Sequence, residues 1–484
     1  MTHLYLDYFS PLAIHMFTLS ERDRTAGSQC LLRYNEGGAV LHEWRRYMTH
    51  APTTHRACAR SWSVAFCVMQ LGYINQVDAA TRQFYQVPVF NDQRFSHSWV
   101  IGKTGVGKST ALVRWAIDDI VAGDGLAFFD PHGDTAEELL RRMPRERLED
   151  VVYFNPAEFA IGFNIFDTIP EERKAFVASS LVDSLKSVWG YSDMATPVLS
   201  QFLYNGARAM MDVPGGTLLG MKFLLTSKRY RDRVLKHIKD PTIADFWRVD
   251  FEEHMPEREQ RQQTLSTLNK IGALISDPAI RACIGQPRSK LDLNAIMDSG
   301  QILIVSLPQG ALGIEKSAMI GSLIMSQLHL AALTRSSDRK PFHIYADECH
   351  NFGAATLAEM LSGIRKFGVS LTLAHQYIDQ LPGKLRSALI GTAGTIVSFR
   401  IGALDVPFIE PEFQLNNSDF SLCELQPFTA YARTGFQTWQ LTMPECDVPE
   451  RPATARKIRN YCRSQYGSDR ALVENRIARF IANT

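Results

Sequence analysis

Residues 98–120 read SWVIGKTGVGKSTALVRWAIDDI, and this stretch sets the architecture expected for the chain. An apolar run at 98–101 leads into a glycine-rich loop, and residues 110–120 follow with helical spacing. Residues 102–109 match the phosphate-loop pattern G-x-x-x-x-G-K-[ST] at every fixed position. A strand, a glycine loop and a helix in this order predict a parallel α/β sheet with a phosphate site at the start of the helix.

The loop residues have the chemistry needed to hold a nucleoside triphosphate. Glycines let the backbone curl so that successive N–H groups face phosphate oxygens, and the helix adds its positive amino-terminal end. Lys108 is expected to reach the β- and γ-phosphates, and Ser109 to give its hydroxyl to Mg²⁺. The sequence therefore predicts a site for ATP (GTP is the alternative) and Mg²⁺, formed by Gly102, Lys103, Thr104, Gly105, Val106, Gly107, Lys108, Ser109 and Thr110.

Further short apolar runs extend the strand pattern along the chain. Several are almost uninterrupted, as expected for strands that are covered on both faces, and they lie at 126–129, 151–154, 302–307, 343–346, 370–374 and 395–399. Residues 167–291 show amphipathic helical segments instead, which predicts a helical insertion between the early and late strands. The expected division is an amino-terminal domain at 1–95 of unassigned fold, a nucleotide-binding α/β domain at 96–450, and a basic helical tail at 451–484.

Hydrolysis requires a carboxylate at the end of a neighbouring strand. The run at 342–346 ends in Asp347 and Glu348, so Asp347 is expected to hold Mg²⁺ and Glu348 to polarise the attacking water. Asp130, which ends another run and is followed by Pro131, is the rival acid and is ranked as a supporting residue. The run at 370–374 is followed by Gln376, which is expected to sense the γ-phosphate and orient water.

Two arginines compete for the role of an arginine finger, a residue that stabilises the charge on a neighbouring subunit's γ-phosphate. Arg365 precedes the run at 370–374, and Arg400 ends the run at 395–399. The sequence leaves the choice open. His375 is interpreted as structural.

Composition restricts the class of protein. The 484 residues are 45% apolar, and 52 Lys and Arg nearly balance 51 Asp and Glu, so any nucleic-acid contact has to be local. Eight cysteines occur without a C-x-x-C pair, which favours reduced thiols and a cytoplasmic protein. No run is long enough to span a bilayer, so a soluble protein without its own membrane segment is expected. The basic tail after residue 452 is interpreted as a solvated helix, with a nucleic-acid contact as the alternative.

With these motifs, the sequence resembles the HerA/FtsK superfamily of P-loop ATPases, and within it the cytoplasmic ATPase domain of type IV secretion (conjugative) coupling proteins. The matching segments are 101–110, 129–134, 152–156, 162–164, 302–310, 345–352, 363–376 with Gln380 and Leu381, and 391–400. The resemblance covers most of residues 95–450. The DPHGD and LAHQ elements are more specific than the phosphate loop.

The resemblance implies a RecA-like core with an additional strand, a ring of six subunits, and ATP sites at the subunit interfaces. By position it supports Lys108, Ser109, Asp347, Glu348 and Gln376, and it implies that Arg365 is the finger. It also implies that DNA is driven through a central channel, for which Lys384 and Arg386, in the loop after Gln376, are candidate contacts. The chain departs from coupling proteins, which carry transmembrane helices, and from FtsK-type translocases, which carry a carboxy-terminal winged helix. The expectation is therefore a soluble form nearer to HerA-like ATPases, which work with a nuclease or another effector.

Three functions follow as hypotheses. The first is a homo-hexameric motor that moves double-stranded DNA, with a nuclease, relaxase or secretion machinery as possible partner. The second is a nucleotide-gated ring scaffold that organises such a partner. The third, a motor for secreted proteins, is disfavoured because no membrane anchor is expected. Glu348, Gln376 and Arg365 favour the motor, since a scaffold needs only the binding loop.

Overall fold

The structure is a computed structural model, and it describes residues 69–77, 84–91, 93–190, 197–335, 339–414, 421–443 and 445–484. These residues belong to one compact unit, Cys67–Thr484. Most of the expected amino-terminal domain, residues 1–68, lies outside the described residues.

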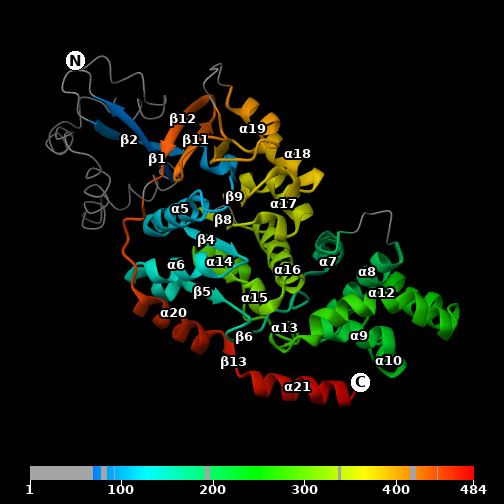
Figure 1. The fold of residues 1–484 in the computed structure, drawn as a ribbon. Helices are drawn as coiled ribbons and strands as arrows, with labels where there is room; N and C mark the ends of the chain where they lie inside the picture. Colours follow the sequence, from blue (N-terminus) through cyan, green and yellow to red (C-terminus); the bar gives the residue numbers. More distant parts are fainter. Residues whose placement is uncertain are drawn as a thin grey trace, which may run out of the picture. The chain divides into compact units, whose positions relative to one another are not determined.

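A sheet with the strand order β2-β1-β12-β11-β10-β3-β9-β8-β4-β7-β5 forms the centre of this unit (Figure 1). The seven strands from β10 to β5 are parallel. All seven are buried along their length, which explains why they read as apolar runs. The predicted parallel α/β fold is confirmed by β3 (Ser98–Ile101), β4 (Gly125–Asp130), β5 (Val151–Phe154), β7 (Ile302–Ser306), β8 (Phe342–Ala346), β9 (Val369–His375) and β10 (Thr395–Ser398).

Four antiparallel strands extend the sheet beyond β10. They are β11 (Thr429–Thr434), β12 (Gln437–Thr442), β1 (Met69–Val77) and β2 (Phe84–Asn91). Tyr73 of β1 pairs with Thr442 of β12, so strands from the two ends of the unit are neighbours. The expected division between residues 95 and 96 therefore falls inside the sheet, because β1 and β2 complete the edge that β11 and β12 begin.

Helices cover both faces of the parallel strands, as right-handed crossovers require. Figure 1 shows α5 (Lys108–Ala122) and α6 (Asp134–Arg142) on one face, and α16 (Ile314–Leu333), α17 (Ala354–Gly363) and α18 (Gly383–Thr392) on the other. The short helix α15 (Gln309–Leu312) precedes α16, and α19 (Val406–Phe413) follows β10.

Between the two-residue strand β6 (Ala160–Ile161) and β7, the described residues form helices. Helix α7 packs on α8 and on α16, and this contact attaches the helical segment to the layer of helices on the parallel sheet. Pro197 and Pro241, which interrupt the helical pattern in the sequence, each begin a helix. The helices are α7 (Lys174–Val188), α8 (Pro197–Asp212), α9 (Leu218–Thr226), α10 (Lys228–Leu235), α11 (Pro241–Asp245), α12 (Glu257–Ser276), α13 (Pro278–Ile284) and α14 (Leu293–Ser299).

The carboxy-terminal residues form two helices, α20 (Pro452–Gln465) and α21 (Arg470–Ala482). Helix α20 packs on α6 and β5, where Arg459 forms ion pairs with Glu137 and Glu158. Part of the basic character of this segment therefore serves internal packing. Within the described residues, no helix has the length and apolar character needed to cross a membrane.

Candidate functional site

The predicted site residues lie mostly at one edge of the sheet. Parallel strands end at the same edge, here called the carboxyl edge, and the opposite edge is called the amino edge. The loop 102–109 follows β3, Asp347 and Glu348 follow β8, and Gln376 follows β9. Since β3, β9 and β8 are adjacent in the sheet, all of these residues come together at the carboxyl edge.

The phosphate loop has the backbone shape that its glycines allow. Gly105 and Gly107 have φ values of 76° and 107°, in the region that favours glycine. Lys108 begins α5, and its Nζ donates hydrogen bonds to the carbonyl oxygens of Gly102 (2.6 Å) and Lys103 (3.0 Å). Burial lowers the pKa of Lys108, against the opposing effect of Glu348 and Asp347. The ammonium group therefore lies over the loop, where phosphate oxygens are bound in this motif.

Ser109 and Asp347 are in direct contact, as a shared magnesium site requires. The Ser109 hydroxyl donates to Asp347 Oδ2 at 2.9 Å. Burial raises the pKa of Asp347 to about 6, and the charges of Glu348 and Asp130 act in the same direction, while the Ser109 hydrogen bond opposes them. Three carboxylates thus repel one another next to a hydroxyl, and this oxygen-rich, electronegative group fits Mg²⁺.

Glu348 is connected to the phosphate loop through Gln376. Thr104 Oγ1 donates to Gln376 Oε1 (2.9 Å), and Gln376 Nε2 donates to Glu348 Oε1 (2.7 Å). The other Glu348 oxygen, Oε2, is buried and has no hydrogen-bond partner among the described residues. Glu348 also has a φ of 48°, a left-handed conformation that costs on the order of 1–2 kcal/mol for a residue with a side chain. His350 Nδ1 lies 3.7 Å from Oε2. A buried carboxylate with one oxygen that accepts no hydrogen bond, held in a strained backbone, is suited to accept a proton from water.

Asp130, the rival acid, is occupied by the backbone. Its two carboxylate oxygens accept hydrogen bonds from the N–H groups of His132 and Ala136, each at 2.8 Å. These bonds hold the turn between β4 and α6. Asp130 therefore acts on the site only through its charge near Asp347.

His375 has a place in the core of the sheet. Its Nε2 accepts a hydrogen bond from Trp99 Nε1 (2.7 Å), and its Nδ1 lies 3.0 Å from the carbonyl oxygen of Tyr377. Burial lowers the pKa of His375 to about 3, so the ring is neutral with its proton on Nδ1. This geometry is consistent with the structural role expected from the sequence.

The two candidate arginines lie at opposite edges of the sheet. Arg400 follows β10 at the carboxyl edge, and its carbonyl oxygen accepts a hydrogen bond from Lys103 N (2.9 Å). Arg365 lies in the short 3-10 helix Ile364–Phe367, directly before β9, and its side chain is exposed. Burial is the main reason why the pKa of His97 is lowered, and the charge of Arg365 lowers it further. His97 lies just before β3, at the amino edge. Arg365 therefore faces away from the nucleotide site of its own chain.

One aromatic residue at the loop was missed by the sequence reasoning. Phe428 N donates to the carbonyl oxygen of Val106 (2.8 Å), and the ring lies against Gly107. The segment 423–428 contains no motif, and the contact joins positions more than three hundred residues apart in the sequence. No sequence signal marks Phe428 as part of the site.

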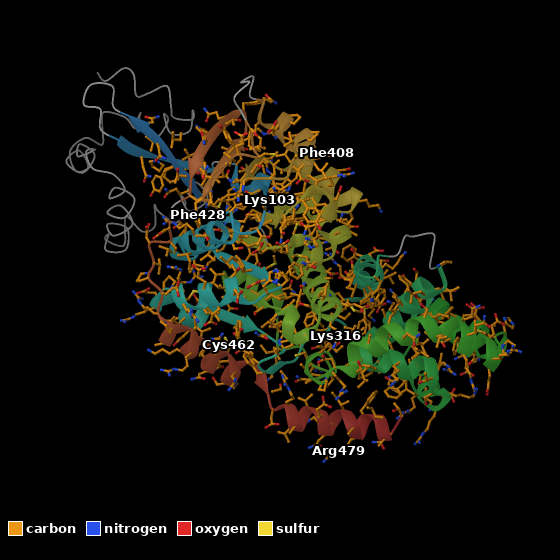
Figure 2. All side chains as sticks on the ribbon, in the orientation of Figure 1. Lys103, Lys316, Phe408, Phe428, Cys462 and Arg479 are labelled. Carbon is orange, nitrogen blue, oxygen red and sulfur yellow. The ribbon has the colours of Figure 1, made fainter. Side chains whose placement is uncertain are left out.

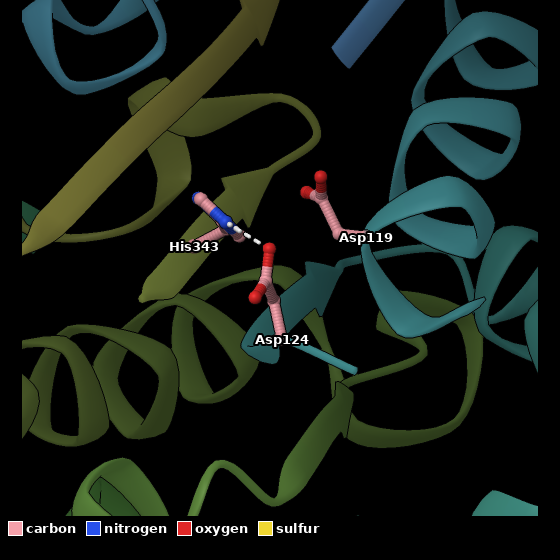
Figure 3. Close-up of side chains that lie close together, drawn as sticks. All are labelled: Asp119, Asp124 and His343. Carbon is pink, nitrogen blue, oxygen red and sulfur yellow. Dashed lines mark hydrogen bonds and ion pairs between the residues drawn. The ribbon is translucent and has the colours of Figure 1, made fainter. Parts of the chain in front are cut away.

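Away from the phosphate site, three potential metal ligands lie together in the part of the chain that the structure describes: Asp119, Asp124 and His343 (Figure 3). Asp119 Oδ2 already accepts hydrogen bonds from Arg94 (2.6 Å) and from the Tyr345 hydroxyl (2.5 Å). A guanidinium group in this position compensates the carboxylate and repels a metal cation. The cluster is therefore a buried ion-pair network at the amino edge.

Comparison with known proteins agrees with this fold. Residues 69–213 match the sequence profile of the family described as type IV secretory system conjugative DNA transfer. The plasmid coupling protein TrwB in complex with ADP and Mg²⁺ has a similar structure, with a TM-score of 0.56 and 16% identity over 80% of this chain and 96% of that chain. VirB4 of Thermoanaerobacter pseudethanolicus gives a TM-score of 0.52 and 16% identity over 78% of this chain and 96% of that chain. Among curated protein sequences, none matches significantly.

The fold and the phosphate loop define a RecA-like P-loop NTPase. Within that class, the family profile matches residues 69–213, and the similarity to TrwB and VirB4 shows that the chain shares their fold.

Proposed function

We propose that the chain is an ATP-hydrolysing motor that assembles as a homo-hexamer and moves double-stranded DNA through a central pore, in conjugative transfer or DNA processing. The observation that carries the proposal is the carboxyl edge, where a phosphate loop, the Ser109–Asp347 pair and the Glu348–Gln376 pair come together. TrwB has been solved with ADP and Mg²⁺ and with non-hydrolysable analogues of ATP and GTP, which supports the same ligands here.

Hydrolysis follows from the side chains at this edge. The loop amides and Lys108 bind the phosphates. To do so, the Lys108 ammonium gives up its hydrogen bonds to the Gly102 and Lys103 carbonyl oxygens and donates to phosphate oxygens instead. Ser109 and Asp347 would hold Mg²⁺, which neutralises charge on the β- and γ-phosphates. Glu348 accepts a proton from the water that attacks the γ-phosphorus, while the bond to the oxygen of ADP breaks. Gln376, hydrogen-bonded to both Thr104 and Glu348, orients that water.

In the proposed ring, a neighbouring subunit would supply a positive charge at the γ-phosphate. Arg365 lies at the amino edge, so it reaches a γ-phosphate only if that edge faces the carboxyl edge of a neighbouring copy. Such a head-to-tail contact generates a closed ring when the rotation between copies closes. DNA held in the ring would be bound through its phosphates, which makes binding dependent on salt and nearly independent of sequence.

The test is steady-state ATP hydrolysis by the purified chain, with and without linear double-stranded DNA, at low and moderate salt, together with the mass of the particle. The motor predicts several-fold stimulation by DNA that fades as salt rises, in a particle of hexamer mass. The Glu348→Gln variant controls for contaminating ATPases. Robust hydrolysis that DNA leaves unchanged would refute the motor and favour the ring scaffold, with a nuclease, relaxase or secretion component as its partner.

A further inference from the structure

Phe428 lies in the loop that leads into β11 and contacts the phosphate loop (Figure 2). Its N–H donates to the Val106 carbonyl oxygen and its carbonyl oxygen accepts from Met443 N, both at 2.8 Å. A Cβ atom placed on Gly107 would come within 2.8 Å of Cδ1 of the phenyl ring. The ring therefore lies directly on the loop backbone, one residue before Lys108.

The backbone of Phe428 is strained. Its φ is 61°, in the left-handed region, where a bulky aromatic residue is a genuine outlier. Strain of this kind persists where surrounding structure holds it, and it concentrates at functional sites. Here the hydrogen bonds to Val106 and Met443 hold it.

The ring gains only part of the burial that would offset this strain, because Phe428 remains 46% exposed. Glycine would adopt the same φ without strain and would relieve the close approach to Gly107. Packing within the chain thus gives an incomplete reason for an aromatic residue at this position, and the exposed part of the ring is available to a ligand.

We infer that Phe428 is the stacking platform for the base of the nucleotide bound at the phosphate loop; this inference rests on the proposed function. Loop amides around Gly107 and Lys108 hold the phosphates, so the ribose and the base leave the loop along its exposed side. The ring of Phe428 is partly exposed and in contact with the loop itself, so it offers an aromatic surface next to the phosphate site. A base has two apolar faces, and an aromatic ring beside the phosphate site covers one of them.

Stacking sets the specificity of the site. Every base has a π-face, so a platform of this kind accepts ATP and GTP alike and binds purines more tightly than pyrimidines because purines offer the larger face. The class of ligand is therefore a purine nucleoside triphosphate, with little discrimination between adenine and guanine.

The experiment measures binding of Mg-ATP and of Mg-tripolyphosphate, which has the phosphates without ribose or base, to the full chain by calorimetry. We expect Phe428→Gly to weaken ATP binding roughly 5- to 150-fold, the range for removal of one base-stacking contact, and to leave tripolyphosphate binding unchanged. Phe428→Leu, which keeps an apolar contact with Gly107 but has no aromatic ring, should show the same pattern. Phe428→Trp should retain ATP binding. Phe436→Ala, at a fully exposed aromatic residue at the tip of the β11–β12 hairpin, is the matched control.

Two results would overturn the inference. If Phe428→Gly binds ATP as tightly as the wild type, the ring does not hold the base. If Phe428→Gly loses ATP and tripolyphosphate to the same extent, the residue supports the loop and not the base. A wild-type chain that binds neither ligand would instead refute the nucleotide site on which the proposed function depends.

Discussion

Replacing Arg365 with alanine tests whether hydrolysis requires two subunits. The strand β9 separates Arg365 from Gln376, and its seven residues span roughly 20 Å at about 3.3 Å per residue. Across that distance the interaction of two unit charges is only about 0.2 kcal/mol in water, and salt screens it further. Within its own chain, Arg365 should therefore change the rate of hydrolysis less than about twofold.

In a neighbouring copy the same arginine would have a much larger effect. An arginine finger accelerates phosphoryl transfer about 10³- to 10⁵-fold, so Arg365→Ala should assemble normally and lose nearly all turnover. Lys366→Ala, at the adjacent exposed cation, is the matched control and should retain it. Arg400→Ala tests the other candidate for the arginine finger, which lies beside the phosphate loop of its own chain.

Mixing two inactive variants then separates action within one chain from action between chains. Arg365→Ala keeps an intact Glu348, and Glu348→Gln keeps an intact Arg365. In randomly mixed rings roughly a quarter of the interfaces join one intact Glu348 to one intact Arg365, so about a quarter of the wild-type rate should return. No recovery in rings shown to contain both variants, or wild-type turnover by Arg365→Ala alone, would refute the reasoning.

Three further outcomes are expected. Lys108→Ala should lose Mg-ATP binding in calorimetry, and undiminished binding would contradict the phosphate-site assignment. Glu348→Gln should bind ATP but turn it over at least ~10²-fold more slowly, which single-turnover kinetics can measure; a normal rate would mean that another group is the base. The pKa of His375 is about 3 in the folded chain and about 6.5 in the unfolded chain, so the contribution of neutral His375 to folding stability is fully present above pH 6.5. That contribution should fall by about 1.4 kcal/mol per pH unit as the pH drops from 6.5 towards 3. His97 and His329, whose pKa burial also lowers to about 4, act in the same direction, and urea unfolding that is insensitive to pH between 7 and 5 would contradict this.

The parallel strands could be predicted because burial on both faces leaves a simple pattern in the sequence. β11 and β12 could not, because both sequences, TAYART and QTWQLT, mix apolar with polar side chains; β11 is buried only at alternate residues, and β12 has a single buried residue. The position of β1 also escaped prediction. It pairs with β12 across most of the chain, and the sequence of one strand does not specify so distant a partner.

At the site, fixed motif spacing identified the loop and the acids, but contacts between motifs required the structure. Asp130 and Asp347 both end apolar strands, and only their hydrogen bonds separate a backbone cap from a partner of Ser109. Arg365 and Arg400 differ in which edge of the sheet they occupy, which the sequence does not state. The contact of Phe428 with the loop depends on its left-handed backbone conformation, which no pattern of residues predicts.

The hydrogen bonds from Thr104 to Gln376 and from Gln376 to Glu348 give a physical reason why hydrolysis would respond to the γ-phosphate. The Gln376 amide contacts both partners, so a phosphate that draws this side chain towards itself would lengthen its hydrogen bond to Glu348. In the proposed mechanism, Glu348 would then be free to accept a proton when the triphosphate is bound. Arg365, at the amino edge, adds a second condition in the proposed ring, because it reaches that phosphate only from a docked neighbour. With both conditions, a subunit would hydrolyse ATP only when it is loaded and in contact, which allows the sites of a ring to act in turn.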